Sequence, residues 1–343
     1  MSQPTFKDFI NVAAKKGIAF PNTVSRLAND ADPQPMLAPN GGIPAIVSTF
    51  IDPTIVETLF TPSKAVSILG REEKRGSWAQ DSFMIQRIES TGDTVAYDDY
   101  SEQGAVQVNN AWEGRDVYRY QTMVTYGELE QERYGLAMLP YAAKKQSAAV
   151  QILDQDQNKF YFYGIDGLRN YGLLNDPALP AAISPLSVTN DSTTVTEWKD
   201  KAVVDIYNDI LALYQDLVAR SKGIVGDGIQ MTDNLVLALS PTSSVYLHKS
   251  NEVFGNSAFD MIKKNFPGLR VETAAQYSTD AGELVQLFAE GAMGQDTGFF
   301  AYSEKLRAHP LVTGVSSYKQ KYSGTSYGAV ITMPMLFAQM VGV

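Results

Sequence analysis

The chain has no cysteine and only two histidines, His248 and His309. The absence of cysteine excludes disulfides, thiolate zinc sites and cysteine nucleophiles. His248 stands in a helical pattern beside Lys249, and His309 precedes Pro310, so surface or turn positions are favoured over ligand positions. No run of 18 apolar residues occurs, and the N-terminus lacks a charged start followed by an apolar stretch. We therefore expect no membrane span and no secretory signal.

Positive charge is also scarce. Twenty-eight Lys and Arg face 38 Asp and Glu, which gives a formal net charge of −10. This balance argues against a chain that grips nucleic acid over its whole surface, because neutralising phosphates needs an excess of basic residues. It suits a protein that stays soluble at high concentration, or that lines a space without adhering to DNA. With 343 residues and 44% hydrophobic content, the chain can form two ordinary packed domains or one large one.

Catalytic signatures are missing as well: there is no P-loop, dinucleotide fingerprint, G-x-S-x-G or H-E-x-x-H. The run Asp154-Gln-Asp-Gln-Asn158 opens like a calcium loop, but Lys159 replaces its glycine and Ile165 its bidentate glutamate. Ser316-Ser-Tyr-Lys319 matches S-x-x-K without the companion motifs of that enzyme class. We expect no catalytic, cofactor-binding or metal-binding residues and no cofactor.

Residues 1–62 contain half of the sixteen prolines, which excludes a compact helical or sheet unit. The same segment is too apolar for a free linker, since it includes Phe6, Phe9, Ile10, Phe20, Ile43, Ile46, Val47 and Phe50. We interpret it as an extended arm that lies on its own body or on a neighbour. A flexible tail is the alternative.

Two alternating segments, Ser82–Ile88 and Val117–Tyr126, predict the strands of a long hairpin. Residues 89–116 between them are polar and strongly acidic. A two-stranded ribbon of this length is not stable alone in water, so we expect it to lie across another subunit. Its acidic tip would need basic partners there, and the candidates are Arg71, Lys74, Arg75, Lys144 and Lys145. An active-site lid is the alternative, although no catalytic cluster is visible for it to cover.

A long helix is predicted over 140–164, because Pro140 suits a first helical turn and Gly164 is the next glycine or proline. Its apolar stripe is thin, which indicates a strut contacted from several sides.

Residues 176–298 alternate helical patterns with short apolar strands and predict a compact α/β lobe. Thr196 is expected to cap the first helix of this lobe. The predicted strands are Leu235–Leu239, Leu269–Thr273 and Leu284–Ala289, and a helix is predicted over Ser257–Phe266. Beyond the lobe, Leu311–Lys319 and Tyr327–Met333 alternate, with a turn expected at 323–325. We place these closing strands beside the long helix, so that the lobe is inserted into a discontinuous first domain.

The order of these parts resembles the major capsid protein of tailed bacteriophages (the Hong Kong 97-like fold), a fold shared with bacterial encapsulin shells. The residues that carry the resemblance are Tyr126-Gly-Glu-Leu-Glu130, the helix through Asp154–Asn158, Tyr163-Gly-Ile-Asp-Gly167, Gly172-Leu-Leu-Asn-Asp-Pro177 and Tyr327-Gly-Ala-Val-Ile-Thr-Met-Pro334. The resemblance implies an α+β fold with an N-terminal arm over 1–62 and an extended loop over 77–126. It also implies a peripheral domain formed by 63–76, 127–175 and 299–343, with the spine helix 140–164, and an inserted axial domain over 176–298.

By the same resemblance the chain is expected to be a non-enzymatic shell subunit of a phage or prophage head. It would assemble into hexamers and pentamers in the bacterial host cytoplasm and enclose double-stranded DNA without sequence preference. Portal, scaffolding and decoration proteins are possible partners, and no membrane is expected. The alternatives are an encapsulin-type nanocompartment and a soluble enzyme with a lid hairpin.

Some family members join subunits by a Lys–Asn isopeptide bond from the extended loop. No lysine lies between Lys74 and Lys144, so we expect no such bond from this loop.

Overall fold

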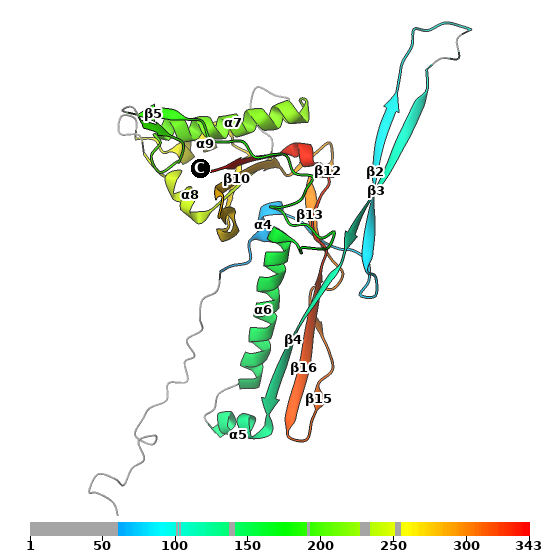
Figure 1. Ribbon diagram of the computed structural model, residues 1–343, viewed down its shortest axis with the longest axis vertical. Helices are drawn as coiled ribbons and strands as arrows, with labels where there is room; N and C mark the ends of the chain where they lie inside the picture. The colour runs from blue at the N-terminus through cyan, green and yellow to red at the C-terminus, as the bar shows by residue number, and fades with distance from the viewer. Residues whose placement is uncertain are drawn as a thin grey trace, which may run out of the picture. The chain divides into compact units, whose positions relative to one another are not determined.

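The computed structural model describes residues 61–100, 102, 104–136, 141–190, 193–226, 234–250 and 255–343, and their helices and strands are drawn in Figure 1. The predicted arm, residues 1–62, lies outside the described residues except for its last two positions. Helices and strands are mixed along the described chain, which confirms the α+β class.

The predicted long helix is α6 (Tyr141–Tyr163). Its 23 residues make a rod about 35 Å long. Two of its six buried residues, Gln157 and Asn158, are polar, which fits a strut held by specific contacts. The helix ends at Gly164, where φ is +63° and a Cβ would lie 2.3 Å from the carbonyl oxygen of Asn170. Glycine is required there, because a side chain would be both strained and in collision.

A long sheet lies against α6 (Figure 1). Strand β4 (Tyr118–Gly127) pairs antiparallel with β16 (Ser317–Ser326), from Tyr118 opposite Ser326 to Gly127 opposite Ser317. The short strands β14 (Arg307–Ala308) and β15 (Val312–Thr313) also pair with β16. The ring of Phe160 on α6 packs edge-on against Tyr118 and Tyr120, with centroids 5.1 and 5.0 Å away.

The turn predicted at 323–325 is wrong, because β16 continues through these residues. At position 324 a glycine allows a side chain of the neighbouring strand to lie close to the backbone of β16. A Cβ at this position would lie 2.7 Å from the ring of Tyr120 on the neighbouring strand. The glycine that indicated a turn in the sequence therefore makes room for a neighbouring aromatic ring.

The predicted hairpin partner is also wrong. Strand β2 (Ser82–Gly92) pairs with β3 (Val106–Asp116), over eleven residue pairs, and not with Val117–Tyr126. The sequence of β3 contains Asn, Trp, Glu and Gly without clear alternation, so its strand character was hidden in the acidic segment. Pairing with β2 satisfies the backbone hydrogen-bonding groups of β3, although its side-chain pattern does not indicate a strand.

The lobe over 176–298 is built on a sheet with the strand order β18-β10-β7-β8, in which β18 comes from the end of the chain. These strands span β7 (Leu235–Leu239), β8 (Arg270–Thr273), β10 (Gly282–Ala289) and β18 (Phe337–Val341), and β9 (Ser278–Thr279) pairs with β10. Helix α7 (Val203–Ser221) contributes Ile206, Ile210 and Leu213 to the core on this sheet. Helices α8 (Pro241–Tyr246) and α9 (Ala258–Asn265) complete the lobe, and Ser257 forms a capping box with Asp260 at the start of α9. The predicted strands and the α9 helix are confirmed.

One expectation about this lobe needs correction. Helix α7 begins at Val203 after Ala202, which makes no side-chain cap, so Thr196 does not cap it; its neighbours Thr193–Val195 form β6 opposite β5 (Val188–Asn190). The last strand, β18, is a strand that the sequence did not predict, and it pairs with β10. Its apolar side chains complete the sheet core, because Ala338 and Met340 are buried with α7.

The remaining elements connect these parts. A three-stranded sheet has the order β1 (Glu72–Lys74), β13 (Gly298–Tyr302), β17 (Gly328–Ile331), and β11 (Gly291–Ala292) pairs with β12 (Gln295–Asp296). Short helical segments are α4 (Ala65–Leu69), α5 (Glu128–Leu136), η1 (Ala275–Tyr277) and η2 (Pro334–Leu336). Among the described helices, none has the length and apolar character needed to cross a membrane.

Candidate assembly surfaces

The chain changes sheets at Val117. Asp116 is the last residue of β3 and pairs with Ser82 of β2, whereas Tyr118 is the first residue of β4 and pairs with Ser326 of β16. Val117 is buried, and its amide donates to the carbonyl oxygen of Asp81 at 2.8 Å. This residue is therefore the point at which the β2–β3 hairpin joins the long sheet, and we call it the pivot.

A buried ion pair fixes the hairpin side of the pivot. The side chains of Arg115 and Asp176 are each 1% exposed, and Nη2 of Arg115 lies 2.8 Å from Oδ2 of Asp176. The same Nη2 lies 2.9 Å from Glu113, and the guanidinium stacks over Tyr171 at 4.8 Å. Burial raises the pKa of the Asp176 carboxyl, while the Ala178 amide and Arg115 oppose the shift. The pair joins the hairpin root to the segment that follows α6.

A second contact joins the pivot to the loop after α6. Arg169 grips the carboxylate of Asp116 with two guanidinium nitrogens, at 3.0 and 2.8 Å, and its amide donates to the same group. These bonds hold the pKa of Asp116 below its ordinary value. The side-chain amide of Asn170 donates both to the carbonyl oxygen of Asp116 and to that of Ser326. It thus links the ends of β3 and β16, which belong to different sheets.

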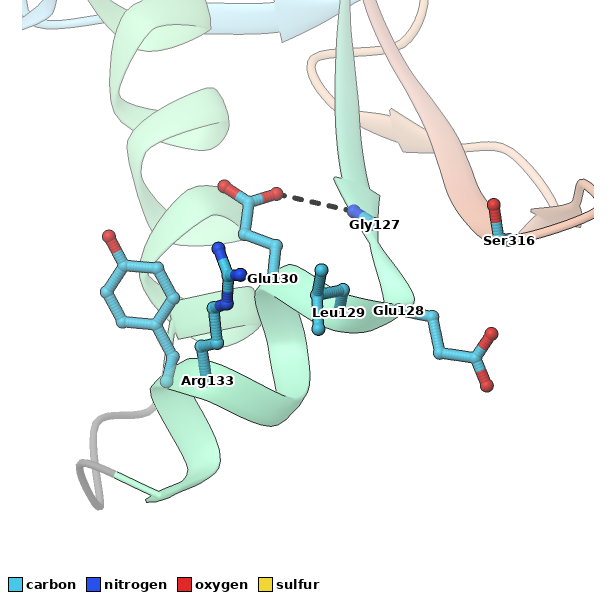
Figure 2. Close-up of a pocket in the computed structure, with 7 residues that line it drawn as sticks. Gly127, Glu128, Leu129, Glu130, Arg133 and Ser316 are labelled. Carbon is cyan, nitrogen blue, oxygen red and sulfur yellow. Dashed lines mark hydrogen bonds between the residues drawn. The ribbon is translucent and has the colours of Figure 1, made fainter. Parts of the chain in front are cut away.

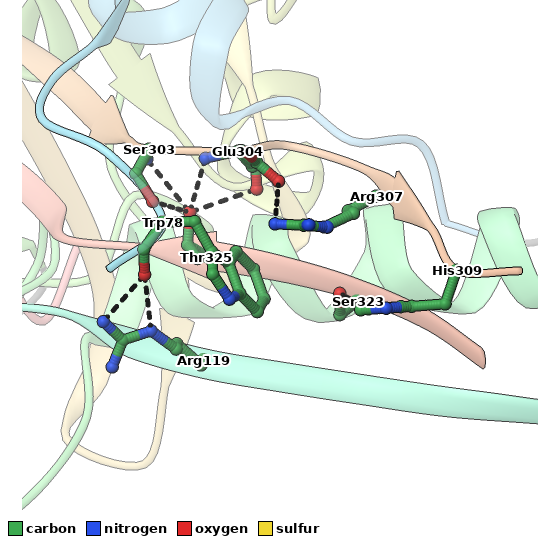
Figure 3. A network of polar contacts seen from close by, with 8 residues as sticks. All are labelled: Trp78, Arg119, Ser303, Glu304, Arg307, His309, Ser323 and Thr325. Atoms are coloured by element: carbon green, nitrogen blue, oxygen red, sulfur yellow. Dashed lines mark hydrogen bonds and ion pairs between the residues drawn. The ribbon is translucent and has the colours of Figure 1, made fainter. Parts of the chain in front are cut away.

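Arg119 on β4 holds the turn that leads into β2 (Figure 3). Its guanidinium donates to the carbonyl oxygens of Trp78 and Gln80 and to the carboxylate of Asp81, at 2.8 to 3.1 Å. The Trp78 ring also lies 5.3 Å from the guanidinium of Arg307 on β14. Figure 3 also shows the hydroxyl of Thr325, which accepts hydrogen bonds from the amides of Ser303 and Glu304.

One face of the β2–β3 hairpin is apolar and exposed. Residues directly opposite each other share a face, so Ser90 and Val108 lie on the same face as Gln86 and Trp112. The exposed apolar side chains on it are Met84, Ile88, Trp112, Val108 and Val106, from 57 to 82% exposed. We call this set the hairpin face. Water contact over so many large apolar groups is unfavourable, and such a patch marks an interaction site.

The outer part of the hairpin is uniformly acidic. No Lys or Arg occurs between Arg87 and Arg115, while Glu89, Asp93, Asp98, Asp99 and Glu102 do. A surface that combines apolar groups with one sign of charge fits a partner with apolar groups and the opposite charge.

The basic residues predicted to receive this tip are mostly occupied within the subunit. Arg71 pairs with Glu73 and Asp296, Arg75 pairs with Glu73, and Lys145 pairs with Glu130. Lys144 also has an interaction partner, whereas Lys74 has no acidic partner within the described residues.

A different basic surface lies on the side of the long sheet that faces away from α6. Lys319 stands opposite Thr125 and Lys321 opposite Met123, and Met123 is 59% exposed. Val312 on β15 stands opposite Lys319 and is also exposed. Within the described chain neither lysine forms an ion pair. We call Met123, Thr125, Val312, Lys319 and Lys321 the outer sheet face, and sequence reasoning missed it because its residues are far apart in the chain.

A surface pocket of about 780 Å³ lies where β4 runs into α5 (Figure 2). Its walls are Gly127, Glu128, Leu129, Glu130, Arg133, Tyr134 and Ser316. Figure 2 shows the Glu130 carboxylate turned to the Gly127 amide, and this carboxylate also accepts from Tyr141 at 2.5 Å and from Lys145 at 3.2 Å. The Tyr141 bond above all lowers the pKa of Glu130. A carboxylate held by three donors is poorly suited to act as a base for Ser316.

The other residues weighed in the sequence have structural partners. Asp154 accepts from Ser63, and Asn158 accepts from the amides of Lys64 and Ala65, so the calcium-like run anchors the start of the described chain to an intact helix. His309 bonds Ser323 at 2.8 Å and His248 stacks near Phe259. In the described residues, no group of three or more His, Cys, Asp or Glu side chains is arranged to hold a metal ion.

Comparison with solved structures supports the fold. The capsid of Myoviridae phage XM1 aligns with a TM-score of 0.70 at 13% identity, over 89% of this chain and 100% of that chain. The capsid of a native GTA particle aligns with a TM-score of 0.59 at 11% identity, over 89% and 97%. Gordonia phage Cozz aligns with a TM-score of 0.53 at 8% identity, over 86% and 91%.

A comparison with protein families matches residues 34–342 to the model described as Pa193 gp26 major capsid protein. The match covers nearly the whole chain, including all the surfaces described above. A search of curated proteins found no match.

Proposed function

The chain belongs to the Pa193 gp26 major capsid protein family and is a structural subunit of a phage shell, and we propose that its β2–β3 hairpin joins each subunit to the next. The encapsulin-type alternative is not favoured, because the matched family is one of phage capsid proteins. The observation that carries the proposal is the hairpin face, an exposed apolar surface on the side of the ribbon opposite Phe83 and Ile85, which pack against the body.

We assign the outer sheet face of a second copy as the landing surface. Its lysines complement the acidic hairpin, and Met123 and Val312 offer apolar contact to the hairpin face. Each large apolar side chain that becomes fully buried contributes about 1.5–3 kcal/mol. The hairpin and its landing surface lie on different parts of the subunit, so the contact is heterologous, as the rings of a closed shell require.

The parts of the subunit are proposed as follows. Residues 1–62 are the N-terminal arm and 176–298 are most of the axial domain, which β18 completes. The peripheral domain comprises 63–76, 127–175 and most of 299–343, with α6 as its spine helix. The extended loop, expected over 77–126, is restricted to about 77–117, because β4 pairs with β16.

The proposed assembly consists of hexamers and pentamers formed in the host cytoplasm around double-stranded DNA, with portal, scaffolding and decoration proteins as further partners. We propose no catalytic role. Among the residues that the structure describes we find no catalytic cluster for the hairpin to cover as a lid. The net charge of −10 limits adhesion to DNA.

Sizing chromatography and negative-stain microscopy of the purified full-length chain test the proposed function. We expect elution as large particles with visible shells. A small oligomer with no particles under any condition in which the chain is folded would contradict the proposal and favour a soluble enzyme.

Charge exchange tests the landing surface. Replacing Lys319→Glu and Lys321→Glu together is expected to abolish particles, because two acidic surfaces then meet. Adding Asp98→Lys and Asp99→Lys to the same chain should restore them. The matched control, Lys74→Glu with Lys144→Glu, reverses the charge of two lysines that the sequence predicted as partners of the acidic tip. If the tip substitutions rescue this control and not the Lys319 and Lys321 variant, the outer sheet face is the wrong surface.

A further inference from the structure

The contacts around the pivot fall into two energetic classes. The Arg115–Asp176 pair is fully buried, so the fold is destabilised when either partner is removed and the other charge is left unpaired. The Arg119–Asp81 and Arg169–Asp116 pairs are half exposed, since the exposed fractions of their side chains range from 24 to 88%. Exposed ion pairs contribute about 0–1 kcal/mol to stability. The stability of the fold therefore does not explain why both arginines bind residues next to the pivot.

Their geometry gives a different reason. Arg119 extends from β4, in the long sheet, and makes its bonds to the turn before β2, in the hairpin. Arg169 extends from the loop after α6 and donates two hydrogen bonds to the carboxylate of Asp116, the last hairpin residue. Each arginine thus connects the hairpin to the body on one side of Val117, and both use several nitrogens of a planar group. A forked donor with two or more acceptors fixes orientation as well as distance.

We propose that Arg119 and Arg169 are positioning residues that set the direction in which the hairpin leaves the body, and thereby the curvature of the shell. This inference rests on the proposed function, because the hairpin must make the contact between subunits. In a heterologous contact, the rotation from one copy to the next decides whether a ring closes and with how many members. Without these bonds the hairpin root would still be held by the Arg115–Asp176 pair and by Phe83 on Tyr327, but its direction would be less closely fixed. A wider range of directions would allow several rotations and hence shells of several sizes.

Spin-label distance measurements test the orientation directly. The chain has no cysteine, so Gln107→Cys, on the hairpin side opposite the hairpin face, and Gln151→Cys on α6 can be labelled without other changes. Both positions are exposed. Labelled chains diluted with unlabelled chains report the distance within one subunit. The test variants are Arg119→Gln with Arg169→Gln, and Arg119→Lys, which keeps the charge and loses the fork.

We expect a broader, shifted distance distribution in both variants, an unchanged unfolding temperature, and particles of mixed diameter. The control is Lys159→Gln, which removes an exposed pair with Asp156 on α6 and should change none of these readouts. An unchanged distance distribution would overturn the proposal. So would a broader distribution with particles of unchanged diameter, and this result would leave the docking role of the hairpin intact. If Arg119→Lys behaves as the unsubstituted chain in both readouts, charge and not the forked geometry is responsible, and the proposal is wrong.

Discussion

Shortening the hairpin is expected to abolish shell formation while leaving the subunit folded. Glu89 and Asn109 are directly opposite each other, so residues 89–109 can be replaced by Asn-Gly, a two-residue hairpin turn. The root pairs from Ser82–Asp116 to Ile88–Asn110 then keep their register. The change removes the outer apolar groups Val106 and Val108 and most of the acidic tip. The described residues of this segment are exposed, apart from the partly buried Thr91, so its removal should take little from the core.

Sizing chromatography, negative-stain microscopy and thermal unfolding together measure the result. We expect a folded small species with an unfolding temperature near that of the intact chain. A variant with only Asp98→Asn and Asp99→Asn separates charge from apolar burial, and should still assemble with a weaker dependence on salt. Closed particles from the shortened chain would show that the hairpin is not the joining element.

Replacing Arg115→Met is expected to cause the largest loss of stability. The substitution leaves the buried carboxyl of Asp176 without its cation, and breaking a buried pair in this way costs about 3–5 kcal/mol. The unfolding temperature should fall by the order of 10 °C. Chemical denaturation of the subunit measures the free energy, and Lys159→Met, at an exposed pair, serves as a control that should change it by less than about 1 kcal/mol.

The loss should depend on pH in a defined direction. Burial already raises the pKa of Asp176, and removal of Arg115 takes away one influence that lowers it. A carboxyl whose pKa is higher in the folded than in the unfolded state costs stability when it is ionised. The cost decreases as pH falls below the folded-state pKa and is gone below the unfolded-state pKa. The difference between the variant and the unsubstituted chain should therefore be large near neutral pH and smaller in acid. An equal difference at both pH values would mean that Asp176 is not the stranded group.

Several elements could be read from the sequence because their signals are local. In the sequence, Pro140 precedes α6 and Gly164 follows it, and no glycine or proline lies between them. Strand β7 is a short apolar run, β10 is apolar over most of its length, and α9 carries its own capping box. Each of these signals involves residues within a few positions of one another, where propensity and capping act.

The misreadings share one cause, which is that pairing partners are chosen over long distances. Strand β4 alternates in the way a hairpin strand would, but its partner β16 lies almost 200 positions later in the chain. Gly324 has the sequence environment of a turn and is used for contact with Tyr120. Alternation shows that a segment has two faces, and it does not show which segment lies beside it.

The same distinction between local signals and long-range pairing applies to the assembly surfaces. The sequence by itself determined that the chain has an acidic tip, a long spine helix, a mixed α+β fold and no cysteine or catalytic motif, because composition and local periodicity are properties of short segments. The tertiary structure alone decided that Met84, Ile88, Trp112 and Val108 share one exposed face, that Lys319 and Lys321 lie beside Met123, and that three arginines meet at Val117. The physical reason is that a surface is formed by residues brought together through strand register and burial, and neither is written in the order of neighbouring residues.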